Sequence, residues 1–106
     1  MKKIETYEEF LAISKQELAI IIAKTKRCVV CQPIKEKLLS FMEDYPMIPS
    51  YEILLEEVEL FQGQQLVFTV PTILVFSEGT EILRESRFID FEKIERLFSN
   101  FLASKT

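Results

Sequence analysis

The chain has 106 residues, of which 48% are hydrophobic and 28% are charged, and its net charge is -4. This length and composition predict one globular domain over 1–106 with its own core, and they exclude a disordered chain. The acidic balance excludes a nucleic-acid binder, which needs a basic face to replace the counterions of the phosphates.

The first residues do not follow the pattern of a secretory leader. Met1-Lys2-Lys3 is followed by acidic residues within 5–9, where a leader would have an apolar segment. The apolar run over 18–23 is far too short to cross a bilayer, so we expect no membrane partner. We therefore expect a cytosolic protein. In that compartment a lone close pair of cysteines is more often catalytic or metal-binding than structural.

Helix and strand signals alternate in the first half of the chain. Thr6 and Glu9 have the spacing of a capping box, which predicts a short first helix, with Ile4 in a short strand before it. The apolar run over 18–23 predicts a strand that is buried on both faces, as in parallel sheets. A polar loop over 24–27 follows. The next helix is indicated by apolar residues at helical spacing and ends near two prolines: Ile34, Leu38, Phe41, Met42 and Tyr45, then Pro46 and Pro49.

The second half of the chain is richer in strand signals. A second strand is predicted over 51–55, and an irregular or short helical crossover over 56–65. A third strand is predicted over 72–76. The Ser-Glu-Gly-Thr sequence over 77–80 indicates a tight hairpin, which leads into a fourth strand over 81–87, antiparallel to the third.

Asp90 is a good N-cap for a last helix. The core-facing stripe of that helix consists of Phe91, Ile94, Leu97, Phe98, Phe101 and Leu102. The order of the elements predicts an α/β fold with a mixed sheet covered by helices on both faces.

Two cysteines lie between the first buried strand and the second helix, in the sequence Cys28-Val29-Val30-Cys31. Unpaired N–H groups and the positive end of the dipole at a helix N-terminus favour a thiolate, and Arg27 adds positive charge beside it. We therefore expect a lowered pKa for Cys28, which makes it the attacking nucleophile. The two-residue gap places Cys31 one helical turn on, where it can resolve a mixed disulfide.

Two other interpretations of the cysteine pair stay open. Both cysteines could be core residues, because free cysteine is often buried as a small hydrophobic group. They could also bind zinc, but the chain has no third cysteine and no histidine. A four-ligand zinc site would then require two chains that share their thiolates.

Lys24, Lys26 and Arg27 form a small basic cluster in an otherwise acidic chain. Such a cluster can stabilise the thiolate and dock an acidic partner, or it can simply be a solvated loop. For Lys24 and Lys26 the solvated loop is the favoured interpretation.

The sequence over 18–102 resembles the thioredoxin superfamily in three features. They are the Cys28–Cys31 motif at the start of a helix, the tripeptide Val70-Pro71-Thr72 before an apolar strand, and the hairpin over 76–79 before a last amphipathic helix. The resemblance implies a thioredoxin fold with a central sheet of four to five strands. It also implies a thiol–disulfide oxidoreductase that acts on protein disulfides in electron transport and redox homeostasis. Such a protein needs no cofactor or metal and is recharged by thioredoxin reductase or a similar dithiol donor.

The resemblance also implies roles for residues outside the cysteine pair. The Val70–Pro71 bond would be cis and lie against the cysteines, and Val70 would offer its backbone to an extended substrate. Val29 and Val30 would be further substrate contacts. The simpler interpretation is that Pro71 only begins a strand at a permitted position.

The sequence departs from the family pattern in three places. The family's Trp-Cys-Gly-Pro-Cys is here the sequence over 27–31, Arg-Cys-Val-Val-Cys, so the reduction potential does not carry over. The family's buried aspartate, six residues before the first cysteine, is here Ile22. Without that acid, resolution by Cys31 is expected to be slow unless water or another carboxylate substitutes. Pro33 lies closer to the cysteines than the family's helix-kinking proline, and we expect it to distort the early turns of its helix.

A function of a different class is a thioredoxin-like binding module with little or no redox turnover. Its docking surface would surround Val29, Val30, Phe68 and Val70. The missing acid and tryptophan favour this interpretation, whereas the two cysteines and the proline before the strand oppose it.

Overall fold

A five-stranded mixed sheet organises the structure, a computed structural model that describes residues 1–105. The strand order is β1-β3-β2-β4-β5. Strands β1, β3 and β2 are parallel, whereas β4 is antiparallel to β2 and β5 is antiparallel to β4. The strands are β1 (Lys2–Ile4), β2 (Ala19–Lys24), β3 (Ser50–Leu54), β4 (Thr72–Ser77) and β5 (Thr80–Ser86). The predicted mixed sheet is confirmed, with the short strand at Ile4 as its fifth member.

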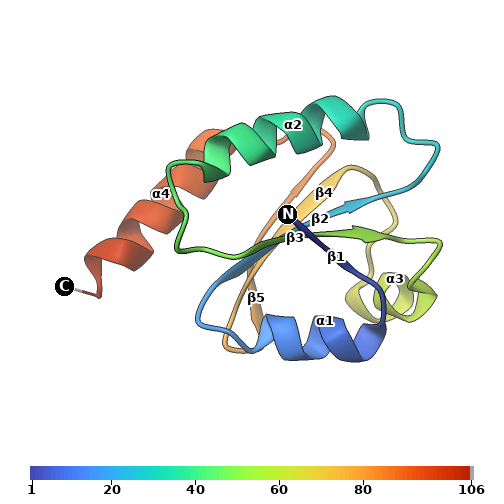
Figure 1. Cartoon of the computed structure of the whole chain (residues 1–106), viewed down its shortest axis with the longest axis horizontal. Helices are drawn as coiled ribbons and strands as arrows, with labels where there is room; N and C mark the ends of the chain where they lie inside the picture. Colours follow the sequence, from blue (N-terminus) through green and yellow to red (C-terminus); the bar gives the residue numbers. More distant parts are fainter. Residues whose placement is uncertain (106) are drawn as a thin grey trace.

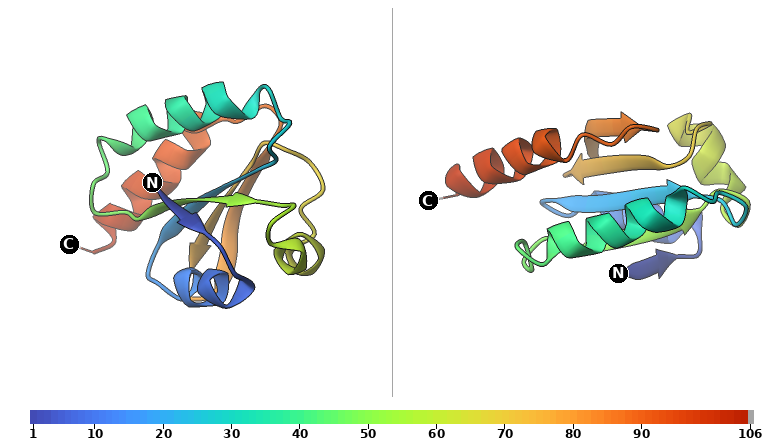
Figure 2. Two further views of the ribbon diagram at one scale, coloured as in Figure 1. Left: turned by 45° about the vertical axis from the view of Figure 1, so that its right-hand side comes forward. Right: turned by 90° about the horizontal axis from the view of Figure 1, so that it is seen from above.

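Four helices in the described residues cover the two faces of the sheet (Figures 1 and 2). Helices α2 (Cys31–Met42) and α4 (Phe91–Ala103) lie on one face. Helices α1 (Tyr7–Ser14) and α3 (Glu59–Gln65) lie on the other. None of these helices is long and apolar enough to span a membrane.

Each face of the sheet has its own apolar core, because the central strands are buried on both sides. Successive residues of a strand point to opposite faces, so Ile20 and Ile22 pack under α2 and α4, while Ile21 and Ala23 pack under α1 and α3. The prediction of a doubly buried strand is confirmed. Other buried members of the first core are Leu38, Ile73, Val75, Ile94 and Phe98; the second includes Phe10, Ile53, Phe61, Leu74 and Phe76.

Side-chain caps begin two of the helices as predicted. At α1, Glu9 N donates to Thr6 Oγ1 at 3.1 Å and Thr6 N donates to Glu9 Oε1 at 3.1 Å, which completes a capping box. At α4, Glu92 N donates to Asp90 Oδ1 at 3.0 Å. Each such cap contributes about 1 kcal/mol.

The predicted element boundaries differ from the structure by short stretches. Lys24, expected in a loop, is the last residue of β2, where it pairs with Leu54 of β3. Helix α2 ends at Met42, and the predicted helical residue Tyr45 follows it in a turn, with its ring centroid 5.2 Å from that of Phe41. The crossover over 56–65 contains the helix α3.

Pro33 does not interrupt helix α2, which is continuous from Cys31 to Met42. The proline therefore does not break the helix, and the expected distortion of its early turns stays a prediction. The physical reason is position: Pro33 is the third helical residue, and the first N–H groups of a helix have no acceptor within it. A proline at this position therefore removes no hydrogen bond from the helix.

Candidate functional site

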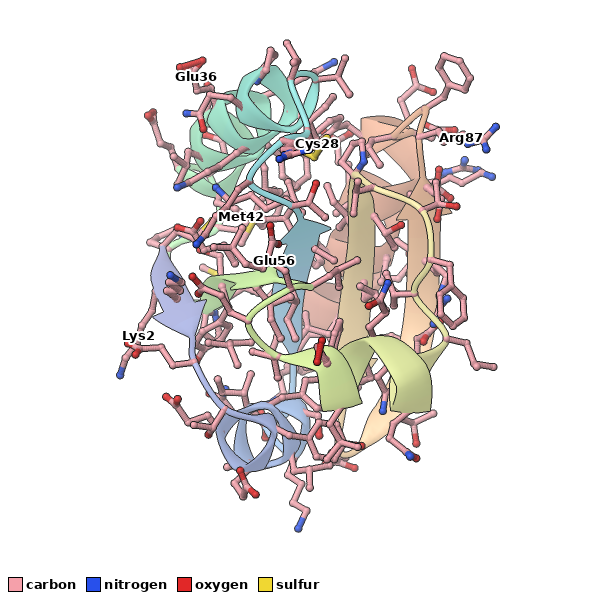
Figure 3. All side chains as sticks on the ribbon, turned by 90° about the vertical axis from the view of Figure 1, so that its right-hand side faces the viewer. Lys2, Cys28, Glu36, Met42, Glu56 and Arg87 are labelled. Atoms are coloured by element: carbon pink, nitrogen blue, oxygen red, sulfur yellow. A yellow bond between two sulfur atoms is a disulfide. The ribbon has the colours of Figure 1, made fainter. Side chains whose placement is uncertain are left out.

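Three chain segments meet at one edge of the sheet. They are the loop over 25–30 after β2, the pair Val70-Pro71 before β4, and Arg87 after β5. Because β4 is antiparallel to both of its neighbours, the ends of β2 and β5 lie beside its start. Figure 3 looks onto this end of the molecule and shows Cys28 near the start of α2, with Arg87 across from it.

Hydrogen bonds hold the segment before β4 against the end of β5. Thr72 Oγ1 donates to Thr69 O at 2.6 Å and lies 2.9 Å from Ser86 Oγ. Arg87 N donates to Pro71 O at 2.9 Å. The peptide bond between Val70 and Pro71 is cis, the geometry that the resemblance implied.

The loop over 25–30 is fixed to the chain that follows β3. Cys28 N donates to Thr25 O at 3.3 Å, and Lys26 N donates to Glu56 Oε2 at 2.9 Å. The hydrogen bond from Lys26 holds the pKa of the Glu56 carboxyl below its ordinary value. The loop that carries the first cysteine is therefore anchored through Lys26 and closed by a turn at Cys28.

Cys28 and Cys31 are joined by a disulfide, with their Cα atoms 5.3 Å apart (Figure 3). Cys31 is the first residue of α2 and only 1% exposed, whereas Cys28 is half-buried in the preceding turn. Cys31 N donates to Cys28 O at 3.2 Å. Of the two cysteines, Cys28 is the one that faces solvent.

The surroundings of the disulfide are apolar and exposed. The side chains of Val29 and Val30 are 85% and 60% exposed. Val30 is the N-cap of α2 and no side chain caps that helix end, so its positive dipole end is open toward the cysteines. Arg27 is exposed, and its guanidinium forms no ion pair with any residue in 1–105.

An ion-pair network that sequence analysis missed lies between β2, β3 and α2. Glu52 accepts from Lys24 Nζ at 2.8 Å on one carboxylate oxygen and from Lys35 Nζ at 2.8 Å on the other. Burial raises the pKa of Glu52, but the hydrogen bonds and the positive charges of the two lysines together lower it by more, so its pKa lies below the ordinary value. Glu52 is the register partner of Ile22, and Lys35 lies one turn beyond Cys31 on α2. The sequence signal that could have indicated this network is the single glutamate, Glu52, inside a strand with apolar neighbours.

A cavity of about 530 Å³ opens beside the disulfide. Its lining includes Val30, Val70 and Pro71, three residues that the resemblance implied as substrate contacts. Arg87 and Phe88 complete its rim and were not foreseen, because only the pairing of β4 with β5 places them there. Other predicted contacts, Val29 and Phe68, are exposed but do not line this cavity.

No metal-binding cluster is found among the residues that the structure describes. Nowhere in 1–105 do three or more His, Cys, Asp or Glu side chains gather as ligands.

A Cys-x-x-Cys disulfide at the start of α2 and a cis-proline before β4, at the same edge of a mixed five-stranded sheet, define a thioredoxin fold with a thiol redox site. The chain is 34% identical to the thioredoxin-like protein YdfQ of Bacillus subtilis (strain 168) over 79% of this chain and 75% of that one. It is 39% identical to a thioredoxin-like protein of known structure from Bacillus cereus ATCC 10987, which superposes with a TM-score of 0.69 over 85% of this chain and 94% of the other. The chain belongs to the thioredoxin superfamily.

More distant structures share the fold alone. Plasmodium falciparum thioredoxin superposes with a TM-score of 0.81 over 94% of this chain and 98% of that one, at 19% sequence identity. No family model matches the sequence. The fold and the close cysteine pair together support a thiol redox role.

Proposed function

We propose that the protein is a thiol–disulfide oxidoreductase that reduces or exchanges protein disulfides through Cys28 and Cys31. The observation that carries this proposal is the asymmetry of the disulfide at the start of α2. Cys28 is half-buried and reachable, whereas Cys31 is 1% exposed and adjacent in space. A solvent-facing nucleophile with a protected second thiol is the arrangement that stepwise exchange requires.

The reaction begins from the dithiol form. The Cys28 thiolate attacks one sulfur of the substrate disulfide, so a Cys28–substrate bond forms, the substrate disulfide breaks, and the first substrate thiolate leaves and takes up a proton. Cys31 then gives up its proton, and its thiolate attacks Cys28 Sγ. This step releases the second substrate thiolate and leaves the Cys28–Cys31 disulfide described above. Two electrons have passed to the substrate.

The start of α2 supplies the stabilisation of the Cys28 thiolate. Its helix dipole has no side-chain cap competing for the N-terminal donors, and such a setting lowers the pKa of a cysteine. Arg27 adds an unpaired positive charge to the same loop. Its role in this proposal is to stabilise the thiolate electrostatically.

The Val70-Pro71 segment is the proposed docking site for the substrate backbone. Neither the N–H nor the C=O of Val70 forms a hydrogen bond with any residue in 1–105. An extended peptide can therefore pair with Val70 as a short added strand, as in β-augmentation. Val29 and Val30 would contact its side chains.

Recharging the site needs a dithiol donor that returns two electrons and two protons. A reductase of the thioredoxin-reductase kind is proposed for this step, in a cytosolic setting where thiols are kept reduced. This part of the proposal, with its place in electron transport and redox homeostasis, rests on the family resemblance.

The test is reduction of the insulin disulfides with dithiothreitol as the electron source. We expect the wild-type protein to accelerate precipitation of the insulin B chain, and Cys28→Ser to abolish the acceleration. Ser14→Ala, at a buried position on α1, is a control that leaves the cysteines intact. Equal rates for wild type and Cys28→Ser would contradict the proposal.

The alternative is a binding module, which the exposed apolar side chains of Val29 and Phe68 favour, at 85% and 69% exposure. In that case no cysteine-dependent turnover is expected. Partner binding would instead survive replacement of both cysteines by serine.

A further inference from the structure

The segment Arg87-Phe88 forms an unusual rim on the cavity beside the disulfide. Arg87 adopts a left-handed backbone conformation with φ of 62°, which is costly for a residue other than glycine. Its N–H is held by Pro71 O at 2.9 Å. Phe88 follows with a side chain that is 91% exposed. The fold thus holds a cation and a large apolar ring in solvent, directly beside the site.

The positive charge of Arg87 is unopposed. Its guanidinium forms no ion pair or hydrogen bond with a residue in 1–105, although the chain as a whole carries a net charge of -4. Arg27, in the cysteine loop, likewise has no ion pair among the described residues. By contrast, other basic side chains near this edge are neutralised, Lys24 by Glu52 and Lys26 by Glu57.

Two acidic residues, Glu85 and Asp90, line a cavity together with Arg87 and have hydrogen-bond partners of their own. Asp90 Oδ1 caps helix α4. Glu85 Oε1 accepts from Asp90 N at 3.1 Å, and its other oxygen lies 3.8 Å from Lys93 Nζ. Neither carboxylate pairs with Arg87, so its guanidinium can pair with a carboxylate of a bound peptide.

The cavity beside Arg87 is lined mainly by apolar side chains. It is lined by Val30, Pro33, Ile34, Val70 and Pro71, and a second cavity shares Ile34, Arg87 and Phe88 with it. An occupant that satisfies both features has an apolar side chain for the cavity and a carboxylate for the rim.

We propose that Arg87 and Phe88 are specificity-determining residues that select disulfides carried on acidic peptide segments. An Asp or Glu close to the substrate cysteine pairs with Arg87, and an apolar neighbour packs between Phe88 and Ile34. This inference rests on the proposed function, because it names the substrate class of the same site. It adds a charge preference that the backbone docking at Val70 does not supply.

The first experiment compares reduction rates of three matched disulfide peptides that differ only in Glu, Gln or Lys beside the cysteine. At low salt we expect the Glu peptide to react about fivefold faster than the Lys peptide, as a single exposed ion pair supports. Arg87→Gln should lower that ratio to about twofold or less, mainly by slowing the Glu peptide; the rest of the preference comes from Arg27. Phe88→Ala should slow all three peptides. The control Arg96→Gln, an exposed arginine on α4 outside both cavities, should keep the ratio.

A second experiment separates this inference from the redox chemistry. Fluorescence anisotropy measures binding of labelled peptides, with serine in place of cysteine, to the Cys28→Ser/Cys31→Ser variant. A preference for the Glu peptide that Arg87→Gln reduces supports the inference, even if the native protein shows no turnover. The same ratio in wild type and Arg87→Gln, in both experiments, would overturn it. A concentration-dependent dimer that Phe88→Ala abolishes would also overturn it, because the rim would then serve a second copy.

Discussion

Glu52 on β3 lies directly beside Ile22 on β2, and its carboxylate joins Lys24 at the end of β2 to Lys35 on α2. The position of the family's buried aspartate is thus apolar, while a carboxylate enters the same region from the neighbouring strand. The side chains of the three charged residues are only 14% to 20% exposed. This network fastens α2, which begins with Cys31, to the sheet.

Replacing Glu52 by Gln should destabilise the fold. The change leaves two lysine ammonium groups close together with no carboxylate between them, which costs about 1 to 3 kcal/mol of unfolding free energy. Urea unfolding of the oxidised protein measures this. Glu95→Gln, at an exposed position on α4, is the matched control and should stay within about 0.5 kcal/mol of wild type. A Glu52→Gln variant as stable as that control would show that the network contributes nothing.

The contribution of Glu52 should depend on pH in one direction. Its pKa is lower in the folded protein than in the unfolded chain, where a glutamate has a pKa of about 4.3. The stability it supplies is therefore complete above that value and is lost as the pH falls through the lower folded pKa. We expect the difference in unfolding free energy between wild type and Glu52→Gln to shrink from pH 7 to pH 3. A difference that grows on acidification would contradict the assignment.

The dithiol form should contain one reactive and one protected thiol. We expect Cys28 to be alkylated by iodoacetamide with a midpoint below the pKa of about 8.5 of a free cysteine, and Cys31 to react far more slowly because it is buried. Mass spectrometry after brief labelling at several pH values identifies the modified residue. Arg27→Gln should shift the midpoint upward, whereas Arg96→Gln should not. Faster labelling of Cys31 than of Cys28 would reverse the assigned roles.

The hydroxyl of Thr72 should stabilise the fold by holding the segment before β4 in place. Thr72→Val keeps the shape of a side chain that is 1% exposed but removes the hydroxyl that bonds Thr69 O and Ser86 Oγ. The change removes two hydrogen bonds whose partner residues, Thr69 and Ser86, can still reach water, so we expect a loss of about 1 kcal/mol in unfolding free energy. Thermal unfolding measures the loss. Thr80→Val, at an exposed position of β5, is the control. Equal melting temperatures for the two variants would contradict this role.

The sequence predicted the layers of the fold because its strongest patterns are local. The unbroken apolar run over 18–23 identified a doubly buried strand, and Thr6 with Asp90 identified two helix starts. The residues at which helices and strands end were predicted less accurately. Lys24 continues β2 because it pairs with Leu54 and bonds Glu52, and neither partner is visible from the residues around it.

The candidate site was predicted where a motif carried it and missed where strand register decided it. Cys28, Cys31 and the cis bond before Pro71 follow from short motifs and a family resemblance. Arg87 lies at the site because Thr72 pairs with Ser86, which places the end of β5 beside the start of β4. The sequence alone does not reveal this register.

The most direct test of the central claim is to trap the reaction halfway. The reduced Cys31→Ser variant, mixed with a peptide disulfide, should accumulate a covalent adduct on Cys28 that mass spectrometry detects, because the second thiol is no longer present to displace it. The wild-type protein should show only a transient adduct and end with its own disulfide. Failure of Cys28 to form any adduct, or an equally fast adduct on Cys31 in a Cys28→Ser variant, would contradict the account.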